Sequence, residues 1–132
     1  KKMAIEGKVL SDLTTNHVIP VAIRYQNILL DNVRNLKDIY GDKDFRKMAA
    51  SQMDLIKCIS EDISAAESLV DELDALDAKL SNEEEGRAAA ILYHDKMAPM
   101  LEEIRSHVDS LEMMVDDQMW PLPKYRELLF IH

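Results

Sequence analysis

The four histidines are the residues of this chain whose type best suits metal or acid–base chemistry. A di-metal centre in a helical bundle uses Glu and His three residues apart on facing helices. No Glu-x-x-His spacing occurs anywhere in the sequence. We therefore predict no metal ligand and expect each histidine to lie at a helix boundary or half-buried with one partner. The histidines are His17, His94, His107 and His132.

The single cysteine, Cys58, is the only candidate thiol nucleophile. Reactive cysteines need a cationic or histidine neighbour, and the sequence places only Lys57 beside this one. We therefore expect Cys58 to be buried and inert. The chain also has no glycine-rich phosphate loop and no Ser-His-Asp set at a recognisable spacing. The sequence predicts no catalytic residue and no cofactor-binding residue.

Acidic residues crowd the middle of the chain, from residue 61 to residue 77. A calcium loop needs a glycine turn and oxygen ligands at alternating positions, whereas these acids follow a helical pattern and predict a solvated helix face. Asp62 is the exception, because it falls in a core column. We expect Asp62 to pair with a cation across the bundle, and the candidates are Arg24, Arg34 and Arg105.

The elements that position these residues are predicted to be long helices. Glycine occurs only three times, and no strand-like alternation or hairpin signal is present. From Phe45 to Leu80 a nearly unbroken heptad predicts one rod of about 50–55 Å. Its apolar stripe is wide enough to face two neighbouring helices. The columns are Phe45, Gln52, Ile59, Ala66, Leu73 and Leu80; Met48, Leu55, Asp62, Leu69 and Leu76; and Ala49, Ile56, Ile63 and Val70.

A second regular stretch follows and contains Pro99. Because the apolar columns keep their phase across this proline, we expect a kinked but continuous helix, with a break into two helices as the alternative. Of the eight methionines, Met48 and Met97 are expected in the core. The columns of this stretch are His94, Leu101, Val108 and Val115, and Met97, Ile104, Leu111 and Gln118.

The first helical region is less regular, and Pro20 either opens a new helix or kinks an old one. We expect Gly41 to end this region in a left-handed conformation. Two faces are expected to carry its apolar side chains. They are Ile5, Val9, Leu13 and His17 before the proline, and Val18, Ala22, Tyr25, Leu29, Leu36 and Ile39 around and beyond it.

The predicted fold class is therefore all-α, with three long antiparallel helices in an up-down-up bundle. The first is broken or kinked near Pro20 and the third is kinked near Pro99. At 132 residues, with 47% hydrophobic but only 5% aromatic residues, residues 1–132 suit a single domain with an aliphatic core. An extended C-terminal strap and a short terminal helix are expected to follow the bundle.

The strap, residues 119–130, holds the only tryptophan and two prolines separated by one residue. Such prolines stop a helix, and a tryptophan on an extended segment needs burial. We predict that the strap docks on its own bundle or on a neighbouring subunit, and that Met113 and Met114 contribute to this contact. The docking residues are Met119, Trp120, Pro121, Leu122, Pro123, Tyr125 and Phe130.

Charge and composition restrict the partners. The net charge of −9 argues against a nucleic-acid partner. The sequence shows no signal peptide and no long uncharged apolar run, which argues against a membrane span. A single cysteine fits a reducing compartment, so a cytoplasmic location is expected.

Three segments resemble the C-terminal region of type III glutamine synthetase, in matching order and spacing. They are residues 16–27, residues 32–37 and the strap with its Trp-Pro-x-Pro-Lys-Tyr-Arg motif. The resemblance implies a parent enzyme that makes glutamine from glutamate, ammonia and ATP with Mg or Mn. It also implies that the upstream catalytic domain and neighbouring subunits are the partners.

No motif of the parent's metal or nucleotide site is present in this chain, so we assign no catalytic, cofactor-binding or metal-binding residue. We expect residues 1–132 to be a non-catalytic structural and assembly domain, a C-terminal piece of a larger enzyme. The alternative is a free-standing helical module that binds other proteins.

Overall fold

The computed structural model describes residues 2–82 and 87–115, and within these ranges the chain is helical almost throughout and has no strand. All-α is therefore the observed class. The helices are α1 (Lys2–Leu13), the π-helical turn η1 (Thr14–Val18), α2 (Ile19–Met48), α3 (Ala50–Asn82) and α4 (Arg87–Met114).

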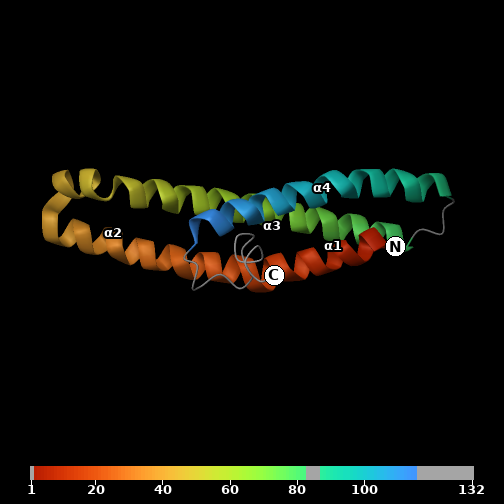
Figure 1. Ribbon diagram of the computed structural model, residues 1–132, viewed down its shortest axis with the longest axis horizontal. Coiled ribbons are helices and arrows are strands. Elements are labelled where there is room, and N and C mark those ends of the chain that lie inside the picture. The colour runs from red at the N-terminus through yellow and green to blue at the C-terminus, as the bar shows by residue number, and fades with distance from the viewer. Residues whose placement is uncertain (1, 83–86, 116–132) are drawn as a thin grey trace, which may run out of the picture.

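The molecule is elongated (Figure 1). The segments α1, η1 and α2 follow one another in a single long rod, which we call the first rod. The chain turns at the far end of α2, α3 returns beside the first rod, and α4 runs back along α3. Because α4 ends before it reaches the turn between α2 and α3, the part of the molecule between its end and this turn consists of α2 and α3 alone among the described residues (Figure 1).

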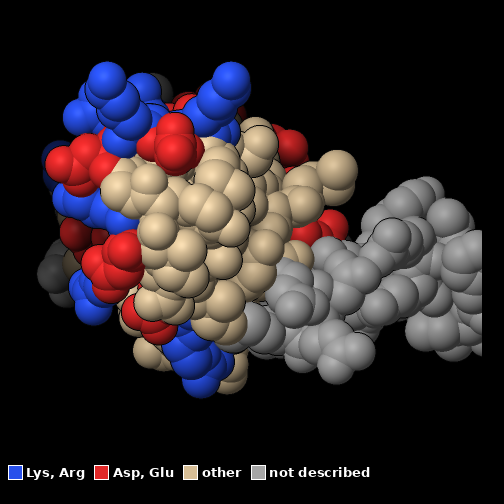
Figure 2. All heavy atoms as spheres, turned by 90° about the vertical axis from the view of Figure 1, so that its left-hand side faces the viewer, with Lys and Arg blue, Asp and Glu red and all other residues tan. Residues whose placement is uncertain are grey.

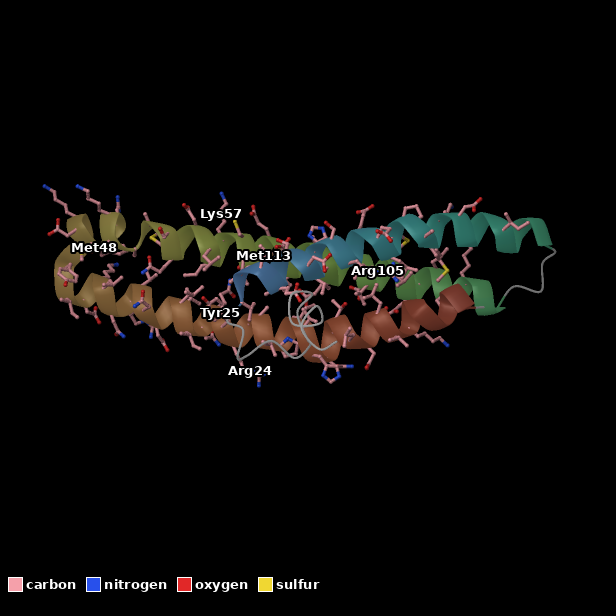
Figure 3. All side chains as sticks on the ribbon, in the orientation of Figure 1. Arg24, Tyr25, Met48, Lys57, Arg105 and Met113 are labelled. Carbon is pink, nitrogen blue, oxygen red and sulfur yellow. The ribbon has the colours of Figure 1, made fainter. Side chains whose placement is uncertain are left out.

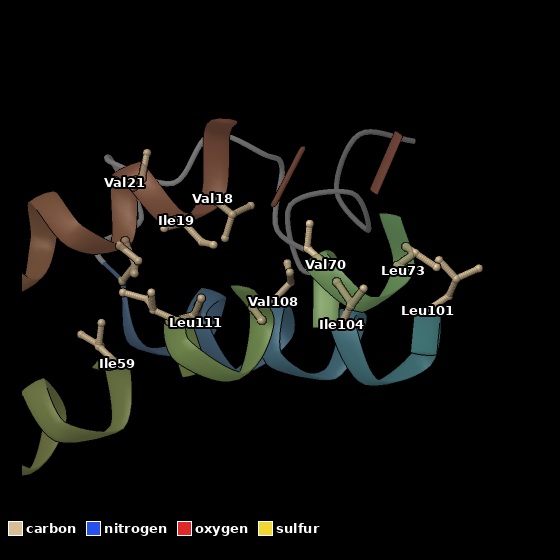
Figure 4. Packing of buried hydrophobic residues seen from close by; sticks show 14 of the residues in the cluster. Val18, Ile19, Val21, Ile59, Val70, Leu73, Leu101, Ile104, Val108 and Leu111 are labelled. Carbon is tan, nitrogen blue, oxygen red and sulfur yellow. The ribbon is translucent and has the colours of Figure 1, made fainter. Parts of the chain in front are cut away.

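The hydrophobic core lies where all three layers overlap (Figure 4). It is aliphatic, as the low aromatic content predicts, and the predicted columns of α3 and α4 supply most of it. Met97 is fully buried as expected. The buried members of these columns are Ile59, Ile63, Ala66, Val70, Leu73, Met97, Leu101, Ile104, Val108, Leu111 and Val115.

The helix α1 packs through small residues. Its buried positions are Gly7, Ser11 and the adjoining Thr14. Val9 and His17 are exposed, so the predicted apolar face before Pro20 was wrong at these two positions. Leu13 of that face packs partly against the core, as predicted. A Cβ atom at Gly7 would lie within 3.6 Å of the Leu73 and Met97 side chains. Small residues therefore allow α1 to approach α3 and α4 closely. The Thr14 hydroxyl is buried and has no hydrogen-bond partner among the described residues.

Pro20 lies in the first turn of α2, which is one of the two predicted possibilities. The backbone stays helical on both sides of η1, but its hydrogen bonds widen, and the Ile19 N–H donates to the Thr14 carbonyl. Pro20 has no N–H to donate to the carbonyl four residues earlier. A π turn just before it accommodates this gap without breaking the rod. The second proline, Pro99, lies inside the continuous α4, so the predicted alternative of a break was wrong.

Gly41 is the pivot at the far end of α2. It has φ 80° and ψ 174°, a positive φ that glycine adopts without steric cost. A short helical piece follows and ends at Ala49, so the predicted unbroken rod from residue 45 was wrong. Met48 is consequently 47% exposed rather than in the core. The heptad spacing continues through this corner, but the helix does not.

Side-chain hydrogen bonds tie the first rod to α3 along its length. Ser11 donates to Asp74 at 3.1 Å, Gln26 donates to the Ser60 hydroxyl at 2.6 Å, and Gln52 donates to Asn32 at 3.0 Å. Each step towards the C-terminus on the first rod is matched by a nearly equal step backwards on α3. The two rods are therefore antiparallel and in one constant register, across the π turn as well as beyond it.

Replacing Ile59 with Ala should lower the free energy of unfolding by about 2–5 kcal/mol, because this fully buried side chain would leave a cavity between the helices. The matched control is Ile39→Ala. Ile39 is 73% exposed, so its truncation should change stability by no more than about 0.5 kcal/mol. Urea unfolding followed by circular dichroism measures both. Equal effects of the two changes would contradict the described core.

Candidate functional site

A cluster of hydrogen-bonded polar side chains joins α3 to α4. The Asp62 carboxylate holds two partners, with Oδ1 2.8 Å from His107 Nδ1 and Oδ2 accepting a hydrogen bond from the Ser110 hydroxyl at 2.5 Å. The Asp62 side chain is only 15% exposed. His107 and Ser110 lie three residues apart on α4, a spacing that places them on one face of the helix.

The prediction that Asp62 pairs across the bundle with an arginine was half right. Asp62 does bond to another helix, but its partners are His107 and Ser110 rather than Arg24, Arg34 or Arg105. Each of the two partners directly precedes a core residue of α4. Both therefore flank the buried stripe and reach Asp62.

Serine, histidine and aspartate are the residue types of a hydrolytic triad, but their order here differs. In a triad the histidine stands between serine and aspartate, so that it takes the serine proton. In this cluster Asp62 stands in the middle, and the Ser110 hydroxyl donates to the carboxylate instead of to a histidine nitrogen. No described contact activates the serine oxygen. The geometry suits a polar tie between α3 and α4.

The remaining histidines bring no further ligands to this cluster. His107 is half-buried with one carboxylate partner, as predicted for a histidine of this chain. His17 is exposed on η1. Nowhere in residues 2–82 or 87–115 do three His, Cys, Asp or Glu side chains converge to form a candidate metal site. The side chain of His94, and all of His132, lie outside the described residues.

Cys58 is exposed, so the prediction of a buried thiol was wrong. It directly precedes the fully buried Ile59 on α3. One helical residue turns the side-chain direction by about 100°, which carries Cys58 out of the core.

Most acids in the middle of the chain lie on the solvated side of α3, as predicted, and Glu61, Glu67 and Asp71 are exposed. Two others face α1 instead. Asp74 accepts the hydrogen bond from Ser11, and the Asp77 carboxylate lies 3.9 Å from the Lys8 ammonium. Helical spacing alone could not distinguish these two from their exposed neighbours.

The predicted docking residues of the strap lie outside the described residues. Of the two methionines expected beside it, Met114 packs partly against the core, whereas Met113 is 84% exposed (Figure 3). Among the described helices, none is both long and apolar enough to span a bilayer.

Comparisons with known proteins show what this chain is similar to. The family model described as the glutamine synthetase C-terminal domain matches residues 1–37. A glutamine synthetase of Bacteroides fragilis (strain YCH46) is 43% identical over 98% of this chain. A type-3 glutamine synthetase of Dictyostelium discoideum is 24% identical over 99% of it.

The predicted resemblance of this chain to the C-terminal helical domain of type III glutamine synthetase is thereby confirmed. The chain spans 18% of the length of each of these two relatives.

Replacing Asp62 with Ala should destabilise the chain by about 1–3 kcal/mol, because two partly buried polar groups on α4 lose their acceptor. The control is Glu102→Ala, which removes an exposed ion pair with Arg105 on the same helix and should cost at most about 0.5 kcal/mol. Thermal unfolding compares the two variants. A double-mutant cycle for Asp62 and His107 that gives no coupling would contradict the tie.

Proposed function

We propose that this chain is a non-catalytic, structural and assembly domain at the C-terminal end of a type III glutamine synthetase. The parent enzyme would make glutamine from glutamate, ammonia and ATP, with Mg or Mn. The observation that carries this proposal is the 43% identity to a glutamine synthetase over nearly the whole chain, which accounts for only 18% of that relative.

The chemistry of the described residues supports a structural role. The one cluster that combines Ser, His and Asp is arranged as a tie between helices, with Asp62 bonded to both of its partners. The other interhelical hydrogen bonds described above likewise join the first rod to α3. An elongated helical bundle whose helices are joined by hydrogen bonds can hold larger domains together without taking part in their reaction.

The finer architecture belongs to the same proposal. Residues 1–132 would form one domain, an up-down-up bundle kinked near Pro20 and Pro99, with the strap as its clasp and a short terminal helix. Its partners would be the upstream catalytic domain and neighbouring subunits of a cytoplasmic homo-oligomer. The elongated arrangement of the helices offers surface for such contacts along its length (Figure 1).

The reading frame upstream of this chain tests the assignment to a larger enzyme. We expect a glutamine synthetase catalytic domain in frame, and removal of residues 1–132 from that enzyme should lower the number of subunits in its assembled particle. Light scattering measures the mass, and nucleotide binding by the shortened enzyme controls for folding of the catalytic part. A particle of unchanged subunit number would contradict the assembly role, and a stop codon upstream would favour the free-standing interaction module.

The strap prediction can be tested in the 132-residue chain. Trp120→Ala should lower stability by about 3–5 kcal/mol if the tryptophan packs on its own bundle, because a large aromatic site would be emptied. Met113→Ala is the matched control, since Met113 lies just before the strap but is 84% exposed. Chemical denaturation measures both. An unchanged midpoint for Trp120→Ala would place its packing site on another part of the parent enzyme.

A further inference from the structure

We propose that the C-terminal segment, residues 116–132, docks on the surface that α2 and α3 leave uncovered beside the last turn of α4 and beyond it. This inference deepens the clasp role proposed above and rests on it. We call this surface the open face. It is formed by Tyr25, Ile28 and Ile39 of α2 and by Leu55 and Cys58 of α3.

One face of α2 is covered at one end and bare at the other. Val21, Tyr25 and Ile28 share it through helical spacing of four and three residues, and Ile39 returns to it three turns later, beyond Asn32 and Asn35. Val21 is 4% exposed, Tyr25 is half-buried, Ile28 is 53% exposed and Ile39 is 73% exposed. The same face therefore passes from core to bare surface along the helix.

The neighbouring face of α3 continues past the end of α4. Asp62 bonds to α4, and Leu55 lies one heptad earlier on the same face and is only partly buried. Cys58 lies between them, three residues after Leu55, and is exposed. The side of α3 that faces α4 thus continues beyond the end of α4 with no described helix over it.

The chain leaves α4 at the edge of this face. Val115 is 3% exposed and its N–H still donates to the Leu111 carbonyl at 2.9 Å, so the exit point is anchored. Figure 3 shows Tyr25 below the last turn of α4, near Met113. Figure 2, which looks at the turn between α2 and α3, shows a continuous area without charged side chains and Lys, Arg, Asp and Glu at its edges.

The length of the segment fits the surface. Tyr25 and Ile39, the two ends of the open face on α2, are separated by about 21 Å at 1.5 Å per helical residue. An extended chain covers that distance in about six residues. The stretch after Val115 reaches Trp120 and Pro121 within that length.

The composition of the segment fits as well. An extended segment that lies on helices cannot pair its backbone N–H groups with theirs, because helical groups are already bonded. Pro121 and Pro123 remove two such donors. Trp120 and Leu122 supply apolar side chains for an aliphatic surface.

The chain carries a natural pair of probes for this contact, because it has one cysteine and one tryptophan. A nitroxide attached to Cys58 quenches tryptophan fluorescence only at short range. We expect a marked loss of Trp120 emission relative to the same protein carrying a diamagnetic analogue of the label, and no change in that loss on dilution. The control is the double variant Cys58→Ser/Ser64→Cys. Its label lies on another, exposed side of α3 and should quench much less.

A second pair of variants tests the surface itself. Ile28→Glu should abolish the quenching and shift Trp120 emission to longer wavelength, because a charge on the open face opposes burial of the strap. Leu30→Glu is its control. Leu30 is also partly exposed but lies two residues on, on the opposite side of α2, so the quenching should be retained.

Three outcomes would overturn the proposal. Short-wavelength emission without quenching from Cys58 would mean that the strap is buried, but at another site. Long-wavelength emission in the unlabelled chain would mean that the strap is not docked, which also removes the clasp role. Quenching that weakens on dilution would assign the open face to a second copy of the chain.

Discussion

The structure depends on the width of the apolar stripe of α3. One neighbouring helix cannot cover a stripe that spans three heptad columns, so α3 needs the first rod on one side and α4 on the other. Ile59 and Leu73 are fully buried because both neighbours are present at their level. Nearer the turn, Ile56 is only partly buried, whereas Ile63 and Val70 of the same column are buried. The length of α4 therefore sets the extent of the core.

Polar contacts determine the register in which the helices pack against one another. Aliphatic stripes pack with similar energy in several registers, because each heptad presents much the same surface. The bonds from Gln26 to Ser60 and from Asp62 to His107 form in one register only. Their net contribution to stability is modest, since the partners would otherwise bond to water. Their effect is to disfavour shifted arrangements.

The sequence predicted the parts of the fold that large, regularly spaced apolar residues specify. The columns of α3 and α4 that include Ile63, Leu101 and Ile104 are buried as expected. The contact of α1 was predicted only in part. Leu13 packs against the core as expected, but Gly7 and Ser11 contribute by being small. A small-residue spacing was the available signal, and it is weaker than a stripe of leucines.

Other predictions of burial were wrong because the sequence of a helix does not specify which residues of other helices pack against it. Ile39 continues an apolar pattern that has no described neighbour, and Cys58 lies on the same uncovered side. For the polar site, the heptad located Asp62 correctly between helices. Its partner could not be chosen from spacing alone, because several cations and polar groups on other helices were compatible with it.

The π turn at Thr14–Val18 restricts the insertion or deletion of residues in this part of the chain. It holds one residue more than an α-helical turn would need, and one residue corresponds to about 100° of rotation. That extra residue sets the angle between the inward face of α1 and that of α2. A chain shortened by one residue here could close a regular α-helix, but Gly7 and Val18 could then no longer face α3 together. The length of this turn is therefore as restricted as the identity of any core residue, although most of its side chains are exposed.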